Sequence, residues 1–166
     1  MGREADPSAS VGMTNIVAEN AVTEAARARI AGRPVLLYDG VCALCNGVVQ
    51  FLLKRDRAGV FRFAPLGSGV ARELAGDGDG VEGVVLVTDA LGEGQRVYRR
   101  SDAVAEALRM LGGGWGFVGR MLALVPRGLR EVGYGLVARV RYQVFGRYEV
   151  CPLPSPGQRA RFLGFE

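Results

Sequence analysis

The sequence predicts an α/β sandwich, in which a mixed sheet of about four strands is flanked by helices and followed by a C-terminal helical extension. Two observations support this. Short apolar runs alternate with segments of helical periodicity over residues 34–112, and only helical periodicity continues beyond residue 113. A chain of 166 residues is long enough for one domain with a real core.

The N-terminal 33 residues predict a flexible or partly helical extension of this domain. Residues 1–12 are small and polar, a composition typical of disorder. Residues 16–31 are rich in Ala, Glu and Arg and favour a helix, but its apolar stripe is thin. We therefore expect a loosely docked segment before residue 34, then the core over residues 34–112, with residues 113–166 packed on it.

The first strand and the first core helix carry the clearest patterns. Residues 35–38 form a continuous apolar run between Pro34 and Gly40, as in a central strand covered on both faces. A helix over about residues 42–57 follows. Its polar residues recur every four positions and so mark a solvated face, namely Asn46, Gln50 and Lys54.

The remaining core elements follow from shorter signals. We expect, in order, a strand at 60–63 ended by Ala64 and Pro65, a helix from the cap Ser68 to about 75, a loop at 76–80, a strand at 84–87, an edge strand at 95–99, and a helix begun by Ser101 and Asp102 that stops at the glycines 112–114. Because a C-x-x-C motif follows the first strand, this succession is the thioredoxin arrangement.

The C-terminal part predicts two further helices, at residues 115–125 and 129–145, separated by Pro126. We expect them to pack on the sheet domain. The alternative is a helix pair on a membrane surface, which five arginines would favour: Arg120, Arg127, Arg130, Arg139 and Arg141. A proline-rich segment at residues 151–156 predicts an extended tail.

Composition excludes several classes of function. The chain has no histidine, so it lacks Cys–His and Ser–His–Asp nucleophiles and every zinc site that needs imidazole. The net charge is only +4, and the sequence contains no block of five or more like charges, so no nucleic-acid partner is expected. Residues 1–33 hold no apolar signal core, and no apolar run reaches the roughly 18 residues of a membrane span, so a cytoplasmic location is expected. The oligomeric state is left open.

Cys42 and Cys45 are the candidate catalytic residues. They lie where a strand passes into a helix, and the positive end of the helix dipole there favours a thiolate, the redox-active form of cysteine. We expect Cys42 to be the exposed attacking thiol and Cys45 the resolving thiol, with no metal or cofactor required. Two alternatives stay open: a zinc site completed by Cys151 and Asp39, and two cysteines that simply pack in the core.

Asp39 and Cys151 are candidate supporting residues. Asp39 would either accept a proton from Cys45 or organise the turn before Cys42, and its charge would raise a nearby thiol pKa. Cys151 would reach the pair if the tail folds back, as a second resolving thiol, or else is a lone thiol. Ser101 and Asp102 would line the same face, although capping explains Ser101 equally well.

The sequence resembles the DCC family. The resemblance rests on residues 38–46 (YDGVCALCN), and continues in residues 62–66, 100–103 and 145–147 and in Cys151-Pro152, so that it covers roughly residues 33–165. It implies a thioredoxin-like fold and thiol–disulfide oxidoreductase activity, with Cys42 and Cys45 as redox pair and Asp39 as the motif acid. The substrate would be a protein or small molecule that bears a thiol or disulfide.

The chain departs from thioredoxin proper in three ways. No tryptophan precedes Cys42, no proline separates the two cysteines, and Glu82-Gly83 stand before the third strand where thioredoxins have a cis-proline. We therefore expect a different substrate groove. A second hypothesis is a non-enzymatic binding module that engages a partner through its basic helical tail.

Overall fold

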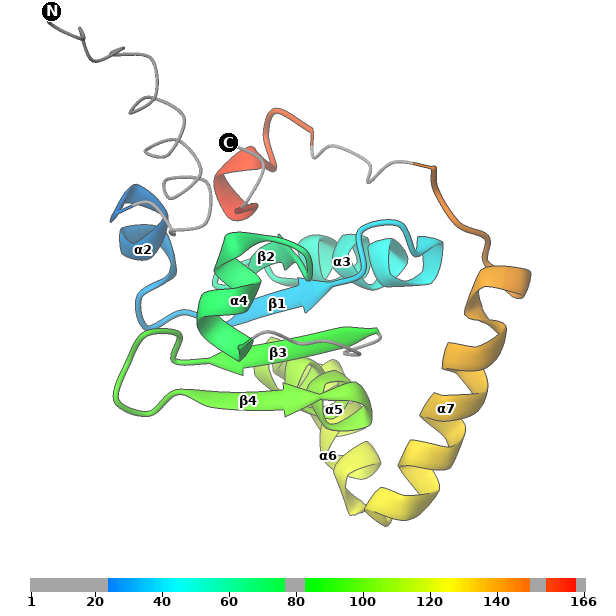
Figure 1. Ribbon diagram of the computed structural model, residues 1–166. Coiled ribbons are helices and arrows are strands. Elements are labelled where there is room, and N and C mark those ends of the chain that lie inside the picture. The colour runs from blue at the N-terminus through cyan, green and yellow to red at the C-terminus, as the bar shows by residue number, and fades with distance from the viewer. Residues whose placement is uncertain (1–23, 77–82, 150–154, 164–166) are drawn as a thin grey trace, which may run out of the picture.

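The computed structural model describes residues 24–76, 83–149 and 155–163. Its elements, in chain order, are α2 (Glu24–Ile30), β1 (Val35–Tyr38), α3 (Ala43–Arg55), β2 (Arg62–Pro65), α4 (Gly69–Ala75), β3 (Val84–Thr88), β4 (Arg96–Arg99), α5 (Arg100–Leu111), α6 (Gly113–Leu124), α7 (Arg127–Val144) and the 3-10 turn η2 (Arg159–Arg161). Figure 1 shows the sheet with helices on both faces and α7 standing along one side.

The sheet confirms the thioredoxin-like prediction. Its strand order is β2-β1-β3-β4. Strand β1 pairs parallel with β2 and antiparallel with β3, and β3 pairs antiparallel with β4. A parallel unit joined by α3, followed by a hairpin, gives the mixed four-stranded sheet that the sequence predicts.

The core lies on both faces of the sheet, because alternate residues of β1 and β3 point to opposite sides. Leu37 and Val85 pack with Ile30 of α2 and Leu74 of α4 on one face. On the other face, the core cluster contains Leu36, Tyr38 and Leu86 together with side chains of α3 and α5 and both motif cysteines. All four residues of β1 are buried, which confirms the predicted central strand.

Strand β2 begins and ends two residues later than predicted. Pro65 was expected to follow the strand, yet it pairs with Tyr38 as the last residue of β2. Since β2 is an edge strand, a proline there breaks no hydrogen bond to a further strand.

Helices α6 and α7 confirm the predicted helix pair. Helix α6 packs closely on α5, because a Cβ on Gly119 would lie 2.6 Å from the backbone nitrogen of Arg109. Pro126 is the N-cap of α7, where a missing N–H costs nothing. The outward sides of both helices remain exposed, so the expected packing on the core covers only one side of each.

The two ends of the described chain also join the core. Ala26 and Ile30 of α2 are buried. At the other end, Leu163 donates its N–H to the carbonyl oxygen of Phe63 at 2.9 Å, and Phe162 and Leu163 are both buried. No local pattern in the sequence predicts this C-terminal contact. The predicted extended tail around Cys151 lies largely outside the described residues.

Candidate redox site

The turn between β1 and α3 places Cys42 at the helix N-terminus. Asp39 Oδ1 accepts the N–H of Val41 at 3.1 Å, and the Asp39 carbonyl oxygen accepts the N–H of Cys42 at 3.3 Å. Cys42 is the N-cap of α3, and its Sγ accepts the N–H of Cys45 at 3.4 Å. An N–H of the first turn, which has no partner within the helix, thus points at the Cys42 sulfur. This arrangement favours negative charge on the sulfur.

Cys42 is buried, contrary to the expectation of an exposed attacking thiol. Its exposed fraction is 0%. The segment after α7 runs antiparallel across it, with a bridge between Cys42 and Arg147. Two backbone hydrogen bonds hold that segment, from Ala43 N–H to Gly146 O at 3.4 Å and from Tyr148 N–H to Val41 O at 2.8 Å. Residues 146–148, which follow Cys42 by about a hundred positions in the sequence, therefore form a cover over it.

Cys45 lies one turn further along α3 and is 4% exposed. Its Sγ lies 4.0 Å from the carbonyl oxygen of Gly83. Burial raises the pKa of Cys45 to about 12, and the hydrogen bond to Cys42 and the charges of Cys42 and Asp39 add to this, while Arg141 opposes it. Cys45 is consequently a protonated thiol at neutral pH, and the effect of Asp39 has the expected direction.

Asp39 is held by two residues of α7 that the sequence did not single out as site residues. Tyr142 donates its hydroxyl to Asp39 Oδ2 at 2.5 Å, and Arg141 lies 3.8 Å from the same oxygen. Arg141 is buried and donates to Tyr142 Oη at 2.9 Å. Burial raises the pKa of Tyr142, and its hydrogen bond to Asp39 adds to that shift. Asp39 thus organises the turn, and it makes no hydrogen bond to Cys45 within the described contacts.

A cavity of about 440 Å³ opens beside Cys45. Side chains of α3, α5, α6 and α7, the start of β3 and the α6–α7 turn line it, and most of them are apolar: Leu44, Val48, Val84, Val104, Leu122, Val125, Val137 and Ala138. Its polar groups belong to Ser101, Arg130, Tyr134 and Arg141. Cys45 lines this cavity, whereas Cys42 does not.

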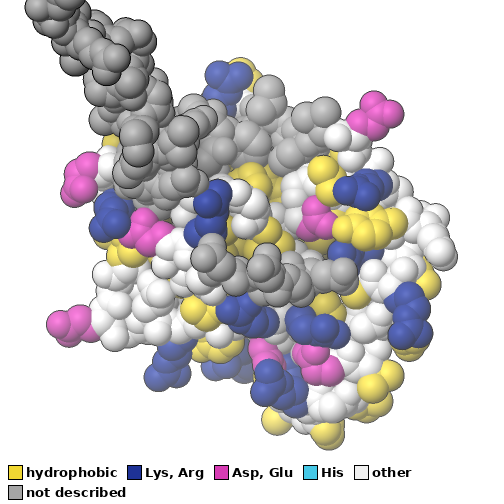
Figure 2. Space-filling view, viewed as in Figure 1, with side chains coloured by type: hydrophobic (Ala, Val, Ile, Leu, Met, Phe, Trp, Pro, Cys, Tyr) yellow, Lys and Arg dark blue, Asp and Glu magenta, His cyan; other side chains and the backbone are white. Residues whose placement is uncertain are grey.

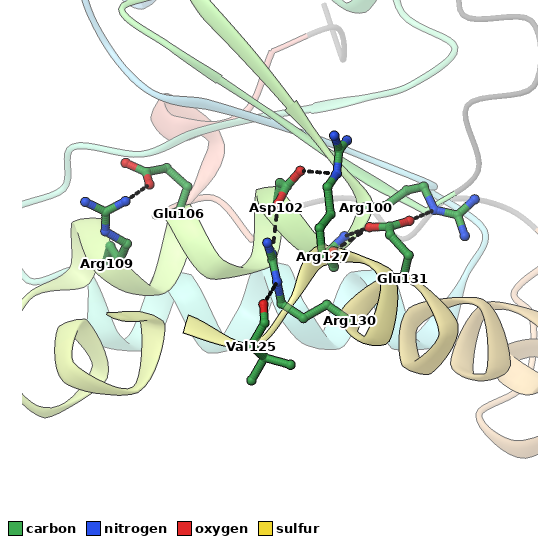
Figure 3. A network of polar contacts seen from close by, with 9 residues as sticks. Arg100, Asp102, Glu106, Arg109, Val125, Arg127, Arg130 and Glu131 are labelled. Carbon is green, nitrogen blue, oxygen red and sulfur yellow. Dashed lines mark hydrogen bonds and ion pairs between the residues drawn. The ribbon is translucent and has the colours of Figure 1, made fainter. Parts of the chain in front are cut away.

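Ser101 and Asp102 connect α5 to α7. Asp102 pairs with Arg130 at 2.8 Å and with Arg127 at 3.2 Å, as Figure 3 shows. Ser101 donates both its N–H and its hydroxyl to Glu131. The capping role expected for Ser101 is therefore wrong, since the N-cap of α5 is Arg99 and the Ser101 side chain turns to α7. Ser101 still borders the cavity.

The remaining predicted ligand set is not assembled in the described part of the chain. Cys151, the expected third ligand or second resolving thiol, lies outside the described residues. Among residues 24–76, 83–149 and 155–163, no three Cys, Asp or Glu side chains are grouped closely enough to bind a metal ion. Nor does any helix of those residues combine the length and the apolar character needed to cross a bilayer.

The fold and the cysteine pair define a thioredoxin-like protein with two free thiols at a helix N-terminus. The chain belongs to the DCC1-like thiol-disulfide oxidoreductase family, whose model matches residues 36–147. It is 38% identical to "Uncharacterized protein YuxK" of Bacillus subtilis over 133 residues. These residues make up 78% of this chain and 93% of that protein.

A plant relative is similarly close. The "DCC family protein At1g52590, chloroplastic" of Arabidopsis thaliana is 36% identical over 125 residues, which make up 73% of this chain and 70% of that protein. No solved structure matches the chain. The family assignment expected from the motif residues is confirmed.

Proposed function

We propose that this protein is a thiol–disulfide oxidoreductase in which Cys42 and Cys45 form and release a reversible disulfide. One observation carries the proposal: Cys42 Sγ caps α3 and accepts the N–H of Cys45, whose own thiol is hydrogen-bonded to Cys42. The two thiols are thus close neighbours across one helical turn, which supports a disulfide between them, and the peptide dipole favours negative charge on Cys42.

The proposed reaction transfers two electrons from the dithiol to a substrate disulfide. The Cys42 thiolate attacks one substrate sulfur, the substrate S–S bond breaks, and a mixed disulfide with Cys42 forms. The departing substrate thiolate takes the proton of Cys45. The Cys45 thiolate then attacks Cys42 Sγ, breaks the mixed disulfide and releases the second substrate sulfur as a thiolate, which takes a proton from solvent. The protein ends as a disulfide and the substrate as two thiols. The reverse sequence oxidises a dithiol.

The high pKa of Cys45 supports this order of attack. At neutral pH Cys45 holds its proton, so it does not compete with Cys42 for the substrate. For Cys42 to reach a substrate, the cover at residues 146–148 has to separate from Val41 and Ala43. Two backbone hydrogen bonds hold the cover there, and a substrate backbone docked along residues 41–43 would replace them.

The second candidate is a binding module whose cysteines serve only in packing. The observation that favours it is the burial of both sulfur-bearing residues in the core beside Tyr38 and Leu86. In that case neither cysteine exchanges with a disulfide while the protein is folded.

Redox titration separates the two candidates. The protein is equilibrated in glutathione buffers of graded potential, alkylated, and analysed by mass spectrometry. An oxidoreductase forms a Cys42–Cys45 disulfide with one midpoint potential, and Cys45→Ser accumulates a mixed disulfide on Cys42.

The control is Cys42→Ser, which we expect to accumulate far less mixed disulfide on Cys45. A binding module keeps both thiols free and tolerates both substitutions. Near-stoichiometric zinc in the reduced protein would instead restore the metal-site alternative.

A further inference from the structure

Helices α6 and α7 present an apolar surface that no part of the described chain covers. We call it the outer face; it consists of Phe117, Met121 and Leu124 on α6 and Leu129, Val132, Leu136, Val140 and Val144 on α7, all exposed. The exposed fraction is 74% at Leu124 and 65% at Leu129, on either side of the turn at Pro126, and 67% at Val144. Single exposed apolar residues are ordinary, but a contiguous apolar face marks an interaction site.

Helix α7 is amphipathic, but its apolar stripe is exposed, whereas a helix that packs on a core buries its apolar stripe. The apolar residues of its outer face recur every three or four positions, over a rise of about 22 Å, and so form one stripe. Three of its charged side chains point the other way: Arg130 reaches Asp102, Glu131 reaches Ser101, and Arg141 lies beside Asp39. The stripe is therefore directed away from the domain.

The charged residues of these helices are almost all positive. Residues 113–145 contain five arginines and one glutamate, a net charge of +4, which equals the net charge of the whole chain. The single glutamate, Glu131, is engaged by Arg100 and Ser101. Arg120 and Arg139 are exposed and flank the outer face. The face thus combines apolar side chains with positive charge and no acidic residue of its own.

We propose that the outer face docks the protein on the surface of an anionic lipid bilayer. Leucine and valine side chains would enter the interface between headgroups and acyl chains, while the arginines contact lipid phosphates. A second copy of the chain is a poorer occupant, because pairing two such faces brings their positive charges together. In Figure 2 apolar side chains gather at the lower right of the molecule, over the corner where α6 passes into α7.

Co-sedimentation with vesicles tests the proposal. The full chain is mixed with phosphatidylcholine vesicles and with vesicles containing 30% phosphatidylglycerol, at low and at high salt. We expect partition to the anionic vesicles, release by salt because charge contacts are screened, and little binding to phosphatidylcholine alone. Leu124→Ser with Leu129→Ser should lower the partition coefficient at least tenfold. Arg120→Gln with Arg139→Gln should lower it about fivefold per arginine.

The matched control is Arg96→Gln with Val97→Ser, which removes one exposed arginine and one exposed apolar residue from β4, and it should bind as the unaltered chain does. Circular dichroism checks that each variant is folded. The proposal is overturned if the chain stays in the supernatant with anionic vesicles, or if the control weakens binding as much as the leucine variant. It is also overturned if light scattering shows a stable dimer that the leucine variant dissociates, since the face would then be an interface between copies.

Discussion

Tyr142 Oη donates a hydrogen bond to Asp39 Oδ2 at 2.5 Å, and so ties the end of α7 to the turn that holds the cysteine pair. The two residues are 103 positions apart in the chain. Because the cover at residues 146–148 begins just beyond Tyr142, this bond also anchors the segment that buries Cys42. We therefore expect the accessibility of the Cys42 thiol to depend on this contact of α7.

Loss of this hydrogen bond should loosen the cover. We expect Tyr142→Phe to lower the free energy of unfolding by about 1–2 kcal/mol, since the hydroxyl loses both its hydrogen bond to Asp39 and the one it accepts from Arg141. The variant should also alkylate faster at Cys42, measured by peptide mass spectrometry after iodoacetamide treatment. Tyr148→Phe is the control, because it keeps the backbone hydrogen bond to Val41. Equal Cys42 alkylation in Tyr142→Phe and in the unaltered chain would show that the cover opens independently of Asp39.

The reactivity of Cys45 should rise with pH far beyond neutrality. With a pKa of about 12, its thiolate fraction increases tenfold for each pH unit up to that value. Cys42→Ser removes the hydrogen bond and the charge that help raise the pKa, so Cys45 should then react at lower pH. The measurement is the alkylation rate of Cys45 from pH 7 to pH 11 in a Cys151→Ser background. A rate that levels off near pH 8.5 in the presence of Cys42 would contradict the structure.

The same pKa makes a prediction about stability. A thiol ionises near pH 8.5 in the unfolded chain but only near pH 12 in the folded protein. The stability that depends on neutral Cys45 is therefore complete below about pH 8.5 and is lost as the pH rises toward 12, at up to about 1.4 kcal/mol per pH unit. Urea unfolding between pH 7 and pH 10.5 should show a steeper decline for the unaltered chain than for Cys45→Ala. Parallel curves for the two proteins would refute the assignment.

Gly83 should not tolerate a side chain. Its φ of +100° is rarely adopted by L-residues, and a Cβ there would overlap Tyr134 Oη. We expect Gly83→Ala to cost about 2–4 kcal/mol of unfolding free energy. Tyr134→Phe removes the overlapping oxygen but also the acceptor of the Val84 N–H, and it leaves the backbone strain. The double variant should therefore be less destabilised than the sum of the two single changes, which a thermodynamic cycle measures. If the losses of unfolding free energy in the two single variants simply add in the double variant, a side chain at position 83 does not contact Tyr134.

The parts of the fold that local signals specify could be predicted from the sequence. The apolar run of β1, the side-chain cap of α4 at Ser68 and the break at Pro126 each depend on a few neighbouring residues. The position of Cys42 at a helix N-terminus followed from the same local pattern, because a strand, a turn and a helix adjoin there.

The features that were missed all depend on contacts between distant segments. Cys42 lies against the segment that contains Arg147, the Asp39 carboxylate accepts from Tyr142, and Ser101 faces Glu131 across 30 positions. None of these pairs leaves a periodic or spacing signal in the chain. Sequence reasoning therefore located the cysteine pair but misjudged its exposure.

Asp56, which lies outside the redox site, should contribute strongly to the free energy of unfolding. It is buried at the end of α3, where Oδ1 accepts the N–H of Val60 at 3.2 Å, Oδ2 accepts that of Phe61 at 2.9 Å, and Arg161 pairs with the same carboxylate. Asp56→Ala should lower the free energy of unfolding by about 3 kcal/mol, because it leaves two N–H groups and a guanidinium without their acceptor.

Arg161→Ala separates the two parts of this contact. The carboxylate keeps both backbone donors, so we expect a smaller loss of about 1–2 kcal/mol. Its effect should concentrate at the C-terminal segment, because Arg161 stands just before Phe162 and Leu163. Hydrogen exchange of the Leu163 amide, which donates to Phe63, should quicken in Arg161→Ala while the amides of β1 and β3 stay protected. Uniform quickening throughout the sheet would instead mean that the C-terminal segment unfolds only together with the whole domain.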